Sequence, residues 1–188
     1  MCASLSGDGG RLGALPTSST VVVRPAVTAD AAAVAGIFNQ GIRERGATFE
    51  TVEHTANEVR DWLTEPLAAA HPFLVADDAD RAVIGWVRAS SYRGRACYSS
   101  IVEFSVYVAG SARGRRVGDA LMSAFIPACA ASGVHKIVSR IFPENEVSRA
   151  LCARHGFREV GVYEKHAQLD GVWRDVVIVE RLISENLA

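Results

Sequence analysis

Residues 100–118 read SIVEFSVYVAGSARGRRVG and pass from a strand pattern, through a glycine- and arginine-rich turn, into the start of a helix. β-Branched and aromatic residues predict a long strand over 97–108, and the spacing of Val117, Leu121 and Phe125 predicts the helix. The N–H groups at a helix start are unpaired and, together with the helix dipole, attract anions. The turn therefore predicts a phosphate-binding site, although its glycine pattern by itself fits a basic, exposed turn equally well.

Glu103 is the candidate catalytic residue because it lies inside this otherwise apolar strand. Strand alternation places Glu103 on one face with Ile101, Ser105 and Tyr107, and places Phe104 with the valines on the other face. A carboxylate is costly to desolvate unless it is paired, hydrated or functional. An amine must lose a proton before it becomes a nucleophile, and a carboxylate can accept that proton. We therefore expect Glu103 to be a buried general base; a partly exposed strand glutamate is the alternative.

The remaining sequence predicts further strands and helices around this segment. Helices are expected to begin at Thr28, Thr55 and Asn145, each of which can cap a helix start. Pro127 is expected to kink the helix that follows the turn, or to end its regular part. Strands are expected at 21–23, 72–76, 82–89, 97–108, 134–141, 160–166 and 172–182. This order predicts an α+β fold, built as a three-layer α/β sandwich with one mixed central sheet flanked by about four helices.

Length and composition limit the class of protein. A chain of 188 residues fits one domain, which we place at 21–183, after a flexible Gly- and Ser-rich extension at 1–20. The formal net charge of −1 argues against a broad basic face for nucleic acid, and no apolar stretch is long enough to span a membrane. The cysteines form no C-x-x-C pair and the histidines no H-E-x-x-H motif. These features predict a cytoplasmic protein without a nucleic-acid, membrane or metal partner.

Taken with its surroundings, the turn resembles the coenzyme A loop of the GNAT acetyltransferase superfamily, R/Q-x-x-G-x-G/A, whose backbone amides bind pyrophosphate. Arg113 and Gly118 match this pattern, whereas Arg116 stands where the middle glycine is usual. Residues 145–148 resemble the family's N-x-x-S segment beside the pantetheine arm. The resemblance implies the GNAT-type acyl-CoA N-acyltransferase fold and acetyl-CoA as cosubstrate. The implied cofactor-binding residues are Val106, Tyr107, Val108, Arg113, Gly114, Arg115, Arg116, Val117, Gly118, Asn145 and Ser148.

Four segments narrow the resemblance to the phosphinothricin acetyltransferase-like branch: 103–108, 47–50, the pattern Tyr-Arg-x-Arg-x-x-Tyr at 92–98, and 171–176. Residues 138–145 and 159–163 look closest to its arsinothricin N-acetyltransferase members. In this branch the glutamate that matches Glu103 is regarded as the base. The resemblance implies acetylation of the α-amine of a glutamate analogue such as phosphinothricin, arsinothricin or methionine sulfoximine, a detoxification or resistance activity.

The same resemblance places the acceptor site at the loop before the catalytic strand. Arg93 and Arg95 can hold carboxylate or phosphinate oxygens through forked, charge-assisted hydrogen bonds, although exposed loop arginines are common. Apolar walls are expected from Phe49 and Trp173, for which plain core packing is the alternative. The implied acceptor-binding residues are Phe49, Tyr92, Arg93, Arg95, Tyr98 and Trp173.

Two other functions stay open. One is a general amino-acid or other small-amine acetyltransferase, although paired arginines disfavour a polyamine. The other is a non-catalytic coenzyme A-binding regulatory module, because Arg116 replaces a loop glycine and Cys152 stands where many relatives have a tyrosine that protonates the departing thiolate. We expect a core-packing role for Cys152, with water or Tyr107 as the proton donor. Relatives commonly dimerise, so a homodimer is expected as well.

Overall fold

The computed structural model describes residues 21–64 and 71–187, so the extension expected at 1–20 lies outside the described residues. The chain forms one seven-stranded mixed sheet with the strand order β1-β2-β3-β4-β5-β7-β6. Its strands are β1 (Val22–Pro25), β2 (Phe73–Asp77), β3 (Val83–Ser91), β4 (Ile101–Val108), β5 (Lys136–Ile141), β6 (Arg158–Leu169) and β7 (Val172–Leu182).

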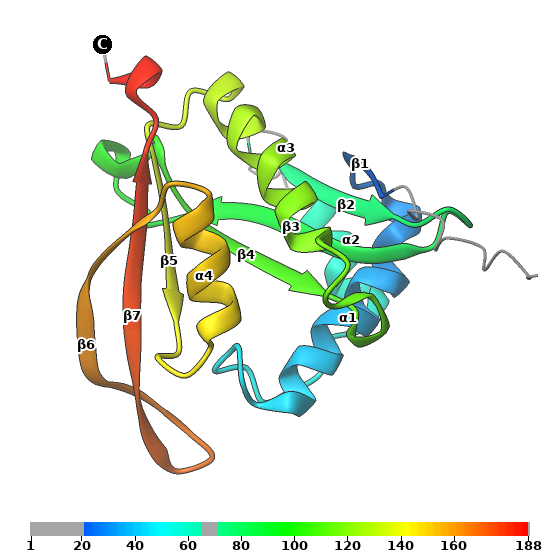
Figure 1. Ribbon diagram of the computed structural model, residues 1–188, viewed down its shortest axis with the longest axis horizontal. Coiled ribbons are helices and arrows are strands. Elements are labelled where there is room, and N and C mark those ends of the chain that lie inside the picture. The colour runs from blue at the N-terminus through cyan, green and yellow to red at the C-terminus, as the bar shows by residue number, and fades with distance from the viewer. Residues whose placement is uncertain (1–20, 65–70, 188) are drawn as a thin grey trace, which may run out of the picture.

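Helices cover both faces of this sheet, with α3 and α4 in front and α1 and α2 behind in Figure 1. Their bounds are α1 (Ala31–Glu44), α2 (Ala56–Thr64), α3 (Val117–Ala131) and α4 (Glu146–Arg154). The predicted three-layer sandwich with a mixed sheet is therefore confirmed. None of the helices in the described part of the chain is long and apolar enough to cross a membrane.

Each interface between layers has its own apolar core, and β4 contributes to both. Val102 and Phe104 are buried beneath α3 with Leu121 and Phe125. On the opposite face, the Tyr107 ring packs edge-on against Phe38 of α1, with ring centroids 4.9 Å apart. Burial of each large apolar side chain stabilises the fold by about 1.5–3 kcal/mol. The predicted alternation along β4 is confirmed, and the strand is fixed from both sides.

Four elements differ from the sequence-based expectation. α1 begins at Ala31 because Thr28–Asp30 form a 3₁₀ turn ahead of it, and the Thr28 side chain caps neither element. β4 begins at Ile101, because Ala96–Tyr98 form a single 3₁₀ turn ahead of it. α3 runs unbroken through Pro127, because buried side chains on both sides of the proline hold the helix against the sheet. β6 is longer than predicted, and two register irregularities keep it paired with β7.

The early end of the β4–β5 pairing positions the site. These parallel strands pair from Ile101 to Glu103 on β4, although β4 itself runs on to Val108. Beyond Glu103 the two strands diverge, as Figure 1 shows. Where they part, Ser139 Oγ donates a hydrogen bond of 3.0 Å to the Phe104 carbonyl. The result is an opening in the sheet, bounded on one side by a stretch of β4 that β5 does not pair.

Candidate active site

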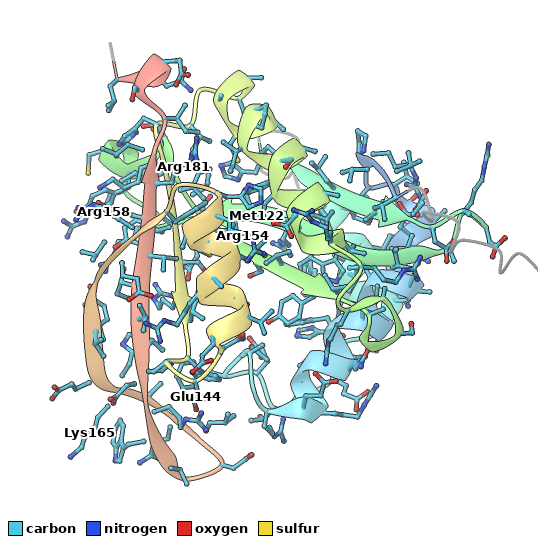
Figure 2. All side chains as sticks on the ribbon, viewed as in Figure 1. Met122, Glu144, Arg154, Arg158, Lys165 and Arg181 are labelled. Carbon is cyan, nitrogen blue, oxygen red and sulfur yellow. The ribbon has the colours of Figure 1, made fainter. Side chains whose placement is uncertain are left out.

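A cavity of about 750 Å³ lies between α1, α3, α4 and the carboxyl half of β4. Glu144, just before the amino end of α4, and Arg154, at its carboxyl end, both line the cavity, which therefore follows the whole helix (Figure 2). A volume of this size is typical of small-molecule and cofactor sites. All the predicted cofactor-binding residues except Arg115 line it: Val106, Tyr107, Val108, Arg113, Gly114, Arg116, Val117, Gly118, Asn145 and Ser148.

A smaller pocket, of about 60 Å³, lies in the opening between β4 and β5. The two spaces adjoin, because they share the lining residues Ala47, Val106, Tyr107, Asn145 and Ser148. The Phe104 carbonyl points toward β5, so strand alternation turns the backbone groups of Val106 toward the opening as well. A backbone N–H in this position can donate a hydrogen bond to a developing oxyanion.

The amino end of α3 has the backbone shape that an anion site needs. Arg116 adopts the left-handed conformation, with φ 60° and ψ 20°, and Gly114 has a φ of 75°. No side chain within residues 21–64 and 71–187 caps this helix end, so its N–H groups remain available to a ligand. Arginine in place of the motif's middle glycine therefore preserves the turn, at a conformational cost of about 1–2 kcal/mol.

Gly118, which is small, and Asn145, which is polar, bring the walls of the cavity together. A Cβ added to Gly118 would lie 3.1 Å from a methyl group of Leu151, so glycine allows α3 to approach α4 closely. Asn145 caps α4 by accepting a hydrogen bond of 3.1 Å from the Ser148 N–H. Its amide nitrogen also donates to the Gly46 carbonyl and links α4 to the segment that follows α1. The predicted capping role of Asn145 is thus confirmed, beside the cavity.

Arg113 lines the cavity, but its guanidinium is bound by Glu44 at the end of α1. The hydrogen bond from Arg113 holds the pKa of Glu44 below its ordinary value. Glu44 lines the same cavity. Sequence reasoning missed this carboxylate, because no local pattern reveals that the end of α1 meets the turn before α3.

Glu103 is the last β4 residue that pairs with β5, directly beside Val138, and it lines neither of the two cavities. Its side chain is 25% exposed, and its Oε1 accepts a hydrogen bond of 2.6 Å from Nη1 of Arg140. The expectation of a buried acid needs correction: the carboxylate is half-buried and ion-paired, which avoids the cost of an unpaired buried charge. Arg140 was missed because its place beside Glu103 depends on the β4–β5 register, which the sequence does not display.

Tyr107 and Cys152 are the side chains considered as proton donors to a leaving thiolate, and both line the small pocket. Burial raises the pKa of the Cys152 thiol to about 12 and the pKa of the Tyr107 hydroxyl to about 12. Proton transfer from such groups to a thiolate of ordinary pKa, about 8.5, is uphill. The geometry favours packing roles, with Cys152 in the core beneath α3 and Tyr107 stacked on Trp86.

The loop between β3 and β4 carries most of the predicted acceptor-binding residues. The Tyr92 and Tyr98 rings pack edge to face with centroids 5.8 Å apart, and Arg93 lies over the Tyr92 ring at 5.2 Å. The pKa of Arg93 is raised chiefly by a hydrogen bond with Tyr92, and Tyr163 of β6 adds to this effect. The strand register places Tyr163 on the same sheet face as Glu103.

The other predicted acceptor-binding residues lie apart. Arg95 is exposed on the loop, Phe49 packs edge to face against Phe142 with centroids 4.9 Å apart, and Trp173 is 54% exposed near the tip of the β6–β7 hairpin. The loop precedes the amino end of β4, whereas the hairpin tip extends past the carboxyl end of β5 (Figure 1). In the described part of the chain, no predicted acceptor-binding residue lines either cavity. One chain therefore does not gather them into a single pocket.

Comparisons with known proteins agree with the fold. A model of the acetyltransferase (GNAT) domain family matches residues 20–158. The chain is 36% identical over 169 residues to phosphinothricin N-acetyltransferase of Streptomyces coelicolor, covering 89% of this chain and 99% of that protein. It is 31% identical over 159 residues to an L-methionine sulfoximine/L-methionine sulfone acetyltransferase of Pseudomonas paraeruginosa, covering 84% and 92%.

A solved structure supports the same assignment. The fold matches the crystal structure of a GNAT superfamily phosphinothricin acetyltransferase from Sinorhizobium meliloti in complex with AcCoA, with a TM-score of 0.83 and 30% sequence identity. The match covers 89% of this chain and 91% of that one. Family model, relatives and fold point the same way: the chain belongs to the GNAT acetyltransferase family and is an N-acetyltransferase.

Proposed function

We propose that the protein transfers the acetyl group of acetyl-CoA to the α-amine of a glutamate analogue such as phosphinothricin, methionine sulfoximine or arsinothricin. The observation that carries the proposal is the ion pair of Glu103 with Arg140, because Arg140 lines the smaller pocket and that pocket adjoins a cavity of cofactor size. The relatives named for phosphinothricin and methionine sulfoximine support this substrate class. Arsinothricin rests on the resemblance at residues 138–145 and 159–163. The activity would serve detoxification or resistance.

The chemistry of the larger cavity fits acetyl-CoA. The N–H groups at the amino end of α3, with Arg113 and Arg116, would hold the pyrophosphate. Asn145, Ser148 and the unpaired stretch of β4 would hold the pantetheine arm. When bound, acetyl-CoA supplies an activated acyl group. The backbone N–H of Val106, which faces the opening, can stabilise negative charge on an acyl oxygen.

Glu103 acts in this proposal as the base for the acceptor. An aliphatic amine is mostly protonated at neutral pH and becomes a nucleophile only after it loses a proton. The half-buried carboxylate lies beside Arg140, which lines the smaller pocket, and it takes this proton directly or through a water molecule.

The proposal includes a homodimer that acts in the cytoplasm. β6 is a 12-residue strand at the edge of the sheet, and it exposes the apolar side chains of Val160, Val162 and Tyr163. Long apolar edge strands are usually paired or covered in native proteins. A second copy of the chain would cover this edge. Light scattering on the purified protein checks this part, and a monomeric mass would contradict it.

The central test is a thiol-release assay with phosphinothricin, methionine sulfoximine, arsinothricin, glutamate and a polyamine as acceptors. We expect turnover of the glutamate analogues and none of the polyamine. Glu103→Gln should lower kcat by about 100- to 10,000-fold, most strongly near neutral pH, where little of the amine is unprotonated. Equal turnover of all amino acids would instead favour a general amino-acid acetyltransferase. Acetyl-CoA binding without turnover of any acceptor would favour a regulatory module.

A further inference from the structure

Arg140 is a cation beside the proposed base to which the family resemblance gave no role. It follows Val138, the β5 neighbour of Glu103, by two residues, so Arg140 and Glu103 lie on the same sheet face. Its side chain reaches across the opening, where Nη1 lies 2.6 Å from Oε1 of Glu103. Arg140 also lines the small pocket in that opening. A cation and a carboxylate thus stand together where the acceptor amine must arrive.

The ion pair leaves binding capacity on Arg140. A guanidinium has five N–H donors in a fixed fork, and within the described residues its hydrogen bond to Glu103 uses one of them. The side chain is 38% exposed, so a small ligand can reach the remaining donors. Lys136, the preceding cation on the same face of β5, is already bound by Glu180 at 3.0 Å. Arg140 is therefore the cation best placed to take an anion next to Glu103.

An α-amino acid carries charges that complement this pair. Its carboxylate carbon lies two covalent bonds from the amine nitrogen, roughly 2.5 Å away. A cation that binds this carboxylate must therefore adjoin the base that receives the amine proton, as Arg140 does. The anion at the far end of a glutamate-like side chain needs a more distant cation, for which Arg93 and Arg95 are available. Building on the proposed function, we infer that Arg140 binds the α-carboxylate of the acceptor and thereby selects α-amino acids over other amines.

The test compares phosphinothricin with its α-carboxamide, which keeps the amine and the phosphinate but lacks the α-carboxylate. Initial rates at saturating acetyl-CoA give kcat and KM for the wild type, Arg140→Gln, Arg140→Lys and the control Arg60→Gln. Arg60 lies exposed on α2, away from both cavities, and its guanidinium donates a hydrogen bond to Asn57. For Arg140→Gln, kcat/KM should fall about 10- to 100-fold with phosphinothricin, mainly through KM, and less than about threefold with the carboxamide. Arg140→Lys should restore part of the loss, because it keeps the charge without the fork.

Equal losses for both acceptors, or no loss for either, would overturn the inference, because Arg140 would then act on Glu103 or on the fold. Thermal melting shows whether Arg140→Gln is unstable. In that case the kinetics of Arg140→Lys with phosphinothricin and with its α-carboxamide decide the role of Arg140. If the wild type rejects phosphinothricin but acetylates another α-amino acid, the proposed substrate is wrong. The same kinetic comparison, made with that amino acid and its α-carboxamide, then tests the role of Arg140. A wild type that acetylates simple amines as well as α-amino acids overturns the inference while leaving an active acetyltransferase.

Discussion

The guanidinium of Arg113 lies 2.6 Å from the carboxylate of Glu44, so the turn before α3 is tied to the end of α1. Gln40 extends this tie, because its amide nitrogen donates to Glu44 and its amide oxygen accepts the Gly110 N–H. The same tie places a carboxylate in the wall of a cavity proposed to bind a polyanion. The charge of Arg113 is therefore partly neutralised before any phosphate arrives.

We predict that Glu44→Gln lowers the KM for acetyl-CoA by about two- to fivefold, because loss of a half-exposed carboxylate is worth up to about 1 kcal/mol. Steady-state kinetics at low and high salt measure the effect, which should shrink as salt screens the charges. Glu53→Gln is the matched control, since it removes an exposed ion pair with Arg43 away from the cavity. A raised KM for Glu44→Gln would show that the tie to α1 matters more than the charge.

Arg116→Gly should raise the free energy of unfolding by about 0.5–1 kcal/mol. The substitution relieves about 1–2 kcal/mol of left-handed strain and returns part of it as greater freedom of the unfolded chain. Thermal melting should show a rise of about 1–4 °C. Arg115→Gly is the control, because Arg115 is not among the residues with positive φ, and it should destabilise the protein. A melting temperature unchanged or lowered by Arg116→Gly would argue against strain at this position.

Cys152→Ala should keep kcat within about threefold, whereas loss of a true general acid costs about 100-fold or more. The thiol acts on stability instead. Its pKa is raised by burial from 9.0 to about 12, so the folded protein keeps a proton that the unfolded chain has lost. The contribution of this group to stability is complete below pH 9 and is lost as the pH rises toward 12. Denaturant unfolding should show that the free energy of unfolding falls less steeply above pH 9 for Cys152→Ala than for the wild type. An equal fall in both proteins would show that the Cys152 thiol does not cause it.

Arg24 bridges the buried carboxylates of Asp30 and Asp77, with nitrogen–oxygen distances of 2.7 Å to each. Hydrogen bonds from Arg24 hold the pKa of Asp30 below its ordinary value of 3.8. Asp30→Asn should therefore lower the free energy of unfolding at neutral pH by about 1–3 kcal/mol. A lowered pKa gives stability that is present above the unfolded pKa and lost as the pH falls through the folded pKa. Urea unfolding should show wild type and variant converging in acid, and a constant gap would contradict this account.

The features that could be predicted from the sequence have local signals. Alternation, glycine placement and helical spacing indicate the passage from β4 through the turn into α3, and all the predicted cofactor-binding residues except Arg115 line the larger cavity. Asn145 was found in the same way, because a helix cap is recognised from neighbouring residues. Local patterns of this kind determine single elements and the turns between them.

The rest depends on which elements meet, and this is not local. Arg140 reaches Glu103 through the register of two strands that are more than thirty residues apart. Glu44 reaches Arg113 from another helix, and its role follows only from the packing of α1 against the turn. Trp173 and the loop that carries Arg93 and Arg95 were expected in one pocket. The register places the loop near the carboxyl end of β7, whereas Trp173 lies near the amino end of that strand.

Because β4 and β5 part so early, the sheet consists of two half-sheets, β1–β4 and β5–β7, joined along a short seam. If acetyl-CoA binds in the opening beside that seam, as proposed, its hydrogen bonds to the unpaired stretch of β4 would connect the two half-sheets further. A ligand that binds the folded chain but not the unfolded chain adds about 2.7 kcal/mol to the free energy of unfolding when its concentration is about 100 times its Kd. Under that proposal, the melting temperature of the protein would depend on the surrounding concentration of cosubstrate as well as on its own residues.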